Sequence, residues 1–467
     1  MKLHFFGAAG TVTGSKHVIE SEDYKLLLDC GLHQGHRQEA YELNKALPFS
    51  AAEIDATILS HAHADHCGTL PLLAHEGYKK AIHCTPATAA IAHLIMTDSA
   101  RVQEGDYRHL LENNPNGTFL PPLYTFDDVE AAAALFSPVE YFRRSKAWTT
   151  LNDRIRFKLY DAGHILGSAV SLIEVKEAGE TKNILFTGDL GNSNVPILPD
   201  PEAVSEAVDA LIIECTYGDR NHEPVSNAED LLEEVITDAV KNKRRIIVPA
   251  FALGRTQELI YILHKLHKAG RIPVIPIYID SPLSNGITEV FAKYKDDFDS
   301  EAWQDFIKDN ESPFAFDKLT YIATAEESKQ LNFQSGPFMV IASSGMAEGG
   351  RVLHHLIHCV RDPEAVVILT GYQAESTLGR RLQDGVTPVR IHDRWYDVRA
   401  RVLTISQFSA HADQNGLVAY ISSLKGLKQV FLVHGEAHQA AALEKILQEK
   451  IPSLLVHIPQ PGDSFAM

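Results

Sequence analysis

Histidine and aspartate concentrate in the short stretch 60–68, with the residue types and spacing of a metal centre. The candidates within it are His61, His63, Asp65 and His66. In an extended segment His61 and His63 point to the same side, whereas Asp65 and His66 follow at the turn into a predicted helix. Ligands that approach from two directions favour two adjacent ions. Imidazole and carboxylate together suit Zn²⁺, with Mn²⁺ or Fe as substitutes. A histidine-rich surface loop is the alternative, and the apolar run directly before the stretch disfavours it.

Single histidines and carboxylates recur where predicted apolar strands end. These residues are Asp29, His164, Asp189, Glu214 and His434. An aspartate placed like Asp189, between an apolar strand and a glycine, can bridge two metals. For Asp29 three roles are open: a ligand, a turn cap, or a carboxylate that fixes the tautomer of a ligand histidine. We favour the last role. His164 lies at a turn between two predicted strands and is a weak signal by itself.

From about residue 218 strand and helix patterns alternate, which predicts a parallel-sheet α/β domain. Its strand-to-helix loops carry serine, glycine and arginine. Helix N-termini bind anions and arginine pairs with phosphate, so we predict phosphate contacts at these loops. The predicted contacts are Ser281, Ser343, Ser344, Arg351 and Arg380. Routine helix capping by serine and glycine is the alternative.

Length and composition describe an ordinary globular protein. The 467 residues suggest two or three domains, and 45% are hydrophobic. No apolar run approaches the roughly 20 residues of a membrane span, and the N-terminus reads as a first strand instead of a secretory signal. Five cysteines without pairing-like spacing indicate reduced thiols in a cytoplasm. A net charge of −18 argues against non-specific coating of nucleic acid. It is compatible with a nuclease, because bound metal ions add local positive charge.

Taken in order, the motifs resemble those of the metallo-β-lactamase superfamily. The pattern His-x-His-x-Asp-His at 61–66, then His164, Asp189 and the upstream Asp29, carries this resemblance. The later block looks like the β-CASP branch of nucleic-acid hydrolases, which includes the polyadenylation-complex nuclease subunit and bacterial ribonuclease J. Stand-alone bacterial and archaeal homologues of that subunit are the most similar group. The segments that indicate them are 249–255, 344–351 and 408–413.

The resemblance covers essentially the whole chain and implies an α/β fold. A metallo-β-lactamase αββα sandwich is expected from residues 1–217 and the returning part 389–467. An inserted parallel-sheet α/β domain of the β-CASP type is expected at 218–388. Because the chain opens on its first strand, we expect no dedicated RNA-binding appendage domain. A homodimer stays open.

The resemblance also implies a ligand set. One metal would be bound by His61, His63 and His164. The other would be bound by Asp65, His66 and His434. Asp189 would bridge them, with a water or hydroxide between. Glu214, His411 and His434 match the three extra motifs of the branch. His434 indicates RNA as the substrate, since DNA-repair members carry a small apolar residue at that position.

The implied activity is that of a zinc-dependent ribonuclease with two Zn²⁺ per chain, in which a metal-activated water hydrolyses the phosphodiester bond. We expect His411 to protonate the leaving 3′-oxygen, and Glu214 to hold the tautomer of His411 and raise its pKa. Endonucleolytic cleavage is expected. Additional 5′-to-3′ exonucleolytic cleavage, the RNA target and the native metal stay open.

Three alternatives compete with this interpretation. A glyoxalase- or lactonase-like hydrolase of small molecules would explain 61–66, His164 and Asp189, but it leaves the block 218–388 without a purpose. A non-catalytic RNA-binding scaffold is disfavoured because every expected ligand is present. A DNA nuclease of the same branch is disfavoured by His434.

Overall fold

The structure is a computed structural model that describes residues 1–35, 37–222, 226–371, 373–374, 376–405 and 409–467. Phe408, the first residue of the motif at 408–413, lies outside these ranges. The chain forms two compact units. The first comprises Met1–Ser193, Asp200–Asn221 and His411–Met467, and the second comprises Asn194–Pro199 and His222–Ala410. No helix in the described ranges is long and apolar enough to cross a membrane.

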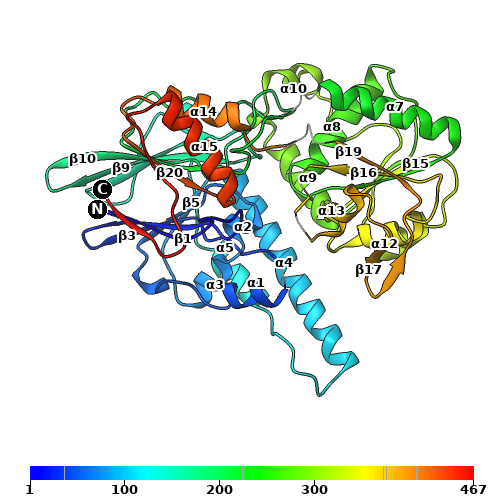
Figure 1. Cartoon of the computed structure of the whole chain (residues 1–467), viewed down its shortest axis with the longest axis horizontal. Coiled ribbons are helices and arrows are strands. Elements are labelled where there is room, and N and C mark those ends of the chain that lie inside the picture. The colour runs from blue at the N-terminus through cyan, green and yellow to red at the C-terminus, as the bar shows by residue number, and fades with distance from the viewer. Residues whose placement is uncertain (36, 223–225, 372, 375, 406–408) are drawn as a thin grey trace. The chain divides into compact units, whose positions relative to one another are not determined.

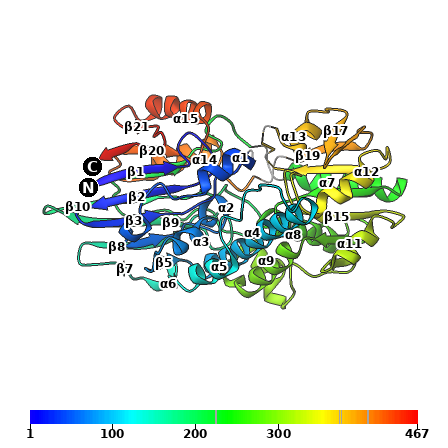
Figure 2. The same ribbon diagram turned by 90° about the horizontal axis from the view of Figure 1, so that it is seen from below.

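The first unit contains two sheets, each of seven strands within the described residues. In spatial order the first sheet is β22 (Ser464–Ala466), β1 (Lys2–Gly7), β2 (Lys16–Ser21), β3 (Tyr24–Leu28), β4 (Ala56–Ile58), β5 (Ile82–Cys84) and β6 (Phe136–Pro138). The second is β21 (Leu455–His457), β20 (Gln429–Val433), β11 (Ala210–Glu214), β10 (Glu180–Phe186), β9 (Ala169–Glu177), β8 (Ile155–Asp161) and β7 (Thr149–Thr150). Both chain ends lie at one end of this unit, because β22 pairs with β1 (Figure 2).

The core of the first unit lies between the two sheets. Phe5 of β1 contacts Phe431 of β20 across it, with ring centroids 5.2 Å apart. Along β10, Ile184 and Phe186 belong to this core, whereas Leu185 belongs to the core on the opposite face of the second sheet. This alternation is the period-two pattern of a strand that is buried on both faces.

Helices cover both outer faces of the sheet pair, which gives the expected αββα order (Figure 1). On the second sheet lie α14 (Gln414–Ser423) and α15 (Ala437–Lys450). On the first sheet's side are α1 (Arg37–Asn44), α2 (Ala64–Cys67), α3 (Leu70–His75), α4 (Pro86–Asn113) and α5 (Phe126–Ala133). The short helices η1 (Ala51–Glu53) and α6 (Phe142–Ser145) complete the unit as described. The predicted α/β fold class is thus confirmed.

The second unit is built on a parallel sheet, which has six strands in the part of the chain that the structure describes. Their order is β14 (Leu319–Tyr321), β13 (Ile277–Asp280), β15 (Phe338–Ala342), β12 (Arg245–Pro249), β16 (Val366–Thr370) and β19 (Arg401–Ile405). Every residue of β15 and β16 is buried, as expected for central strands covered on both faces. A hairpin is formed by β17 (Val389–Ile391) and β18 (Arg394–Tyr396).

The helices of the second unit connect these strands. They are α7 (Ser226–Asn242), α8 (Arg255–Lys268), α9 (Pro282–Lys293), η2 (Lys295–Asp297), α10 (Ser300–Asp305), η3 (Ile307–Asp309), α11 (Ala325–Leu331), α12 (Arg351–Cys359) and α13 (Leu378–Gln383). Their alternation with parallel strands matches the strand and helix patterns of the sequence from about residue 218 onward.

The compact units divide the chain at other places than the expected boundaries at 217 and 388. The second unit continues to Ala410, because β19 pairs in parallel with β16 from Val366↔Arg401 to Thr370↔Ile405. It also includes the segment 194–199, where the carbonyl of the buried Ile197 accepts a hydrogen bond of 2.7 Å from the amide of Asp299.

Candidate metal centre

The candidate ligands meet because of which strands are neighbours in the first unit. Strands β10, β11 and β20 lie side by side and parallel, so their carboxyl ends share one edge of the second sheet. Asp189, Glu214 and His434 come at or just after these ends. In the first sheet β3 and β4 are also parallel neighbours, and they bring Asp29 and the stretch 60–66 to a common edge.

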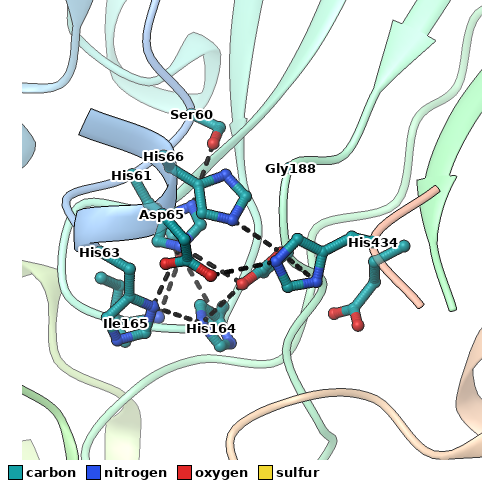
Figure 3. Close-up of polar contacts among 12 residues, drawn as sticks. Ser60, His61, His63, Asp65, His66, His164, Ile165, Gly188 and His434 are labelled. Carbon is teal, nitrogen blue, oxygen red and sulfur yellow. Dashed lines mark hydrogen bonds and ion pairs between the residues drawn. The ribbon is translucent and has the colours of Figure 1, made fainter. Parts of the chain in front are cut away.

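Three imidazoles and one carboxylate form a first group, which Figure 3 shows around His61, His63 and His164. The Nδ1 atom of His63 lies 3.1 Å from Nε2 of His61 and 3.2 Å from Nε2 of His164. These two Nε2 atoms are each 3.4 Å from Oδ2 of Asp189. Tetrahedral zinc with bonds of about 2.0–2.1 Å separates its ligands by about 3.3 Å. The spacing of the group therefore fits one ion.

Asp65, His66 and His434 form a second group beside the first. Nε2 of His434 lies 3.2 Å from Oδ2 of Asp65, and Nε2 of His66 lies 3.3 Å from Oδ1 of Asp189. The two carboxylate oxygens of Asp189 thus face different groups, Oδ2 the first and Oδ1 the second. This is the arrangement that a bridging carboxylate requires.

Asp29 is fully buried and orients histidines of both groups. Its Oδ2 lies 2.7 Å from Nδ1 of His66 and accepts a 2.9 Å hydrogen bond from the hydroxyl of Ser60. The same hydroxyl lies 3.0 Å from Nδ1 of His61. With protons on these Nδ1 atoms, the Nε2 lone pairs of His61 and His66 face the centre.

The chemistry of the group atoms fits a metal cofactor. Nε2 of His66 and Oδ1 of Asp189 are buried and 3.3 Å apart, yet neither has a well-aligned hydrogen bond among the described residues, although buried polar atoms are normally paired. Burial, reinforced by His61, lowers the pKa of His63 to about 3, and burial also lowers the pKa of His61 and of His164. These imidazoles are therefore neutral at neutral pH, as metal ligands must be.

Glu214 and His411 form a pair at the edge of the first group. Nδ1 of His411 lies 2.9 Å from Oε1 of Glu214 and 3.9 Å from Oδ2 of Asp189. Burial opposes protonation of His411, but the charges of Glu214 and Asp189 outweigh it and raise its pKa to about 9. Glu214 itself is held by the amide of Leu190 at 2.7 Å. The pair can hold and release a proton beside the candidate metal ligands.

The five residues predicted to contact phosphate all lie in the second unit. The hydroxyl of Ser343 donates to that of Ser281 at 2.7 Å, at the carboxyl ends of β15 and β13. Ser281 caps α9, and Ser344 accepts from the amide of Glu348, so both also serve the local backbone.

Both predicted arginines have carboxylate partners within the second unit. Nη1 of Arg351 lies 2.7 Å from the buried Asp280, and Nε of Arg380 lies 2.9 Å from Asp384 one helical turn away. Contact of these arginines and of the three serines with RNA stays a prediction.

Sequence reasoning assigned no role to Ser60 and Thr216, whose hydroxyls contact His61 and His434. Ser60 directly precedes His61 in the sequence. Thr216 follows Glu214 by two residues, which in an extended chain places both side chains on the same side. This position beside a functional carboxylate was the available signal.

Comparison with known proteins yields matches along most of the chain. Residues 10–250 match the metallo-β-lactamase superfamily, residues 256–382 the β-CASP domain, and residues 395–459 the Zn-dependent metallo-hydrolase RNA specificity domain. A small-molecule hydrolase leaves the middle match without explanation.

Several curated proteins are similar over nearly the full length. A ribonuclease of Thermus thermophilus is 34% identical, and the match covers 96% of both chains. An RNase J-like protein of Methanocaldococcus jannaschii is 31% identical over 97% of both chains. A transcription termination factor of the same organism is 29% identical, over 93% of this chain and 67% of that protein.

A solved structure shares the fold. It is the crystal structure of a protein of unknown function from Enterococcus faecalis V583, with a TM-score of 0.53 and 12% identity over 100% of this chain and 99% of the other.

Proposed function

This chain belongs to the metallo-β-lactamase superfamily and to its β-CASP branch, and from this premise we propose that it is a metal-dependent ribonuclease. The match to an RNA specificity domain at 395–459 supports RNA as the substrate, since it includes His411 and His434. The similar proteins named as a ribonuclease and as RNase J-like support the same class.

The observation that carries the proposal is the bridging position of Asp189 between two ligand groups. Two Zn²⁺ ions would be held, one by the group around His63 and one by the group around His66. When bound, such ions lower the pKa of a shared water and neutralise charge on the phosphate. Asp189 faces both groups with its two oxygens: Oδ2 lies 3.4 Å from Nε2 of His61, and Oδ1 lies 3.3 Å from Nε2 of His66.

His411 would provide the proton that the leaving 3′-oxygen needs. Its Nδ1 is occupied by Glu214, so the proton that it gives up is the one on Nε2. Glu214 keeps the imidazole in this tautomer and stabilises its protonated form. The RNA backbone would be held by Ser281, Ser343, Ser344, Arg351 and Arg380 of the second unit.

All five cysteines are buried thiols, and a cytoplasmic location stays a prediction.

The test is digestion of a structured RNA that is labelled at either end, with and without a 5′ monophosphate. We expect zinc-dependent internal fragments from both labels, and their loss in Asp189→Ala. A DNA of the same sequence is the control for substrate class and should stay intact. Equal cleavage by wild type and Asp189→Ala, or cleavage of a thioester or lactone but no RNA, would contradict the proposal.

A further inference from the structure

Thr216 lies next to His434 in a position that no catalytic role explains. It follows the end of β11, and its side chain is within hydrogen-bond distance of two atoms of one histidine. Oγ1 of Thr216 lies 3.0 Å from the backbone carbonyl oxygen of His434 and 3.1 Å from its ring atom Nδ1. We propose that Thr216 is a positioning residue that sets the tautomer and ring orientation of His434. The inference rests on the proposed metal-dependent function and concerns the group formed with Asp65 and His66.

The assignment of hydrogen bonds follows from what a hydroxyl can do. A threonine hydroxyl has one proton and two lone pairs. It donates its proton to the carbonyl oxygen of His434 and accepts the proton on Nδ1 of the same residue. The ring then presents the lone pair of Nε2, which lies 3.2 Å from Oδ2 of Asp65. Oδ1 of Asp189 is farther from Nδ1 than the threonine hydroxyl, at 3.6 Å, beyond hydrogen-bond distance.

The backbone conformation of His434 is also held by hydrogen bonds to neighbouring segments. His434 has φ +48°, in the left-handed region that is uncommon for residues other than glycine. Its amide donates to the carbonyl of Ala8 at 2.6 Å, and its carbonyl accepts from the amide of Cys215 at 3.3 Å. A side chain at Gly435 would clash, since a Cβ there would lie 2.4 Å from Sγ of Cys215. The hydroxyl of Thr216 adds to these backbone contacts, because it bonds both the carbonyl oxygen and the ring of His434.

The residues that bond the Nδ1 atoms of His66 and His434 differ in chemistry. His66 is held by the buried carboxylate of Asp29, whereas His434 is held by a neutral hydroxyl. Glu214 on the same segment contacts His411. Residues 214–216 thus support two functional histidines from the end of one strand. Removal of the Thr216 hydroxyl should weaken the ion held by Asp65, His66 and His434 and leave the group around His63 intact.

The experiment measures metal binding without RNA. Metal-free wild type, Thr216→Val and Thr216→Ser are titrated with Co²⁺, followed by its absorption spectrum, and with Zn²⁺ in competition. Valine keeps the shape of threonine without its hydroxyl, and serine restores the hydroxyl. We expect Thr216→Val to lose about 10- to 100-fold in affinity for one of two ions, the usual effect of losing an outer partner of a ligand. Thr216→Ser should bind both ions like wild type.

Thr57→Val is the matched control, because Thr57 is a buried threonine of the same unit whose hydroxyl bonds that of Tyr78 instead of a candidate ligand. It should bind both ions like wild type. Wild-type affinities in Thr216→Val, or equal losses in the serine variant or the Thr57 control, would overturn the inference. If the valine variant fails to fold, Thr216→Ala decides in the same titration. A protein that binds two ions and cleaves no RNA would overturn the ribonuclease proposal and leave this inference standing.

Discussion

At the scale of single residues, the candidate centre is defined by which nitrogen of each imidazole faces inward. Asp29 and Ser60 direct Nε2 of His66 and His61 toward Asp189, while His63 presents Nδ1. His411 differs from His61 and His63, because Glu214 occupies its Nδ1 and favours its protonated form, whereas burial lowers the pKa of those two histidines. For these three residues of one type, the environment matches the different roles that we propose.

His411→Ala should abolish most cleavage while both ions stay bound. The loss should be about 10²- to 10⁴-fold in kcat, the usual contribution of a general acid. Single-turnover cleavage and zinc content per chain are the measurements. Loss of zinc together with activity would show that His411 is a ligand instead of the acid.

Glu214→Gln should shift the basic limb of the pH–rate profile to lower pH. Burial opposes protonation of His411, and the negative charge of Glu214 is the largest factor that raises its pKa. Without that charge His411 loses its proton at lower pH, so activity as an acid ends earlier as the pH rises. We expect a shift of about one unit or more. An unchanged basic limb would remove His411 from the rate-determining proton transfer.

At the scale of elements, strand β2 carries a histidine in the core between the sheets. His17 contacts Phe5 and Phe186, and both of its ring nitrogens lack a partner among the described residues. Burial lowers the pKa of His17 to about 3, with neighbouring charges contributing less. The folded protein therefore keeps His17 neutral where an unfolded chain would protonate it.

This histidine predicts a loss of stability in mild acid. Above pH of about 6.5 His17 is neutral in both states and has no effect. Between about 6.5 and 3 the unfolded chain binds a proton that the folded protein does not, so stability falls as the pH falls. At pH 5 the cost is about 2 kcal/mol.

His17→Leu should remove this part of the pH dependence. Urea unfolding of wild type and variant at pH 8 and pH 5, both with chelator, gives the four free energies. The difference between the two proteins should change by about 2 kcal/mol in favour of the variant at pH 5. A difference that does not change with pH would show that His17 accepts a proton in the folded protein.

At the scale of the whole molecule, the candidate ligands connect distant parts of the sequence within one unit. They extend from His61 to His434, and all belong to the first compact unit. A bound ion would therefore join segments that the chain separates by the entire second unit. Binding to the folded state alone stabilises it by about 4 kcal/mol when free metal is 1,000 times the Kd.

Metal removal should loosen the first unit selectively. In hydrogen exchange with chelator, amides in the segments that follow β4, β10, β11 and β20 should lose protection. The amides of β12, β15 and β16, in the buried sheet of the second unit, should keep theirs. Equal loss of protection in the strands of the first unit and of the second unit would contradict a metal site confined to the first unit. Re-addition of Zn²⁺ should restore the original pattern.

The motifs allowed the family to be predicted correctly, because each motif is recognised from residues that are close together in the sequence. The ligand types within 61–66 are set by spacing, and Asp189, Glu214 and His434 each stand out at the end of an apolar strand. The strand and helix alternation of the second unit was also visible, since the hydrophobic period is a local property.

The resemblance implied which of these strand-end residues meet, and only the tertiary structure gave the physical reason. Asp189 and His434 come together because β10, β11 and β20 are parallel neighbours, and strand pairing over such distances leaves no local trace in the sequence. For the same reason the extent of the second unit to Ala410 depended on β19 pairing with β16. Ser60 and Thr216 were assigned no role from the sequence, because a hydroxyl can orient a histidine only when the fold brings the two side chains into contact. The sequence by itself determined the types of functional group and, through the resemblance, their grouping, whereas the folded chain decided their orientation and their hydroxyl partners.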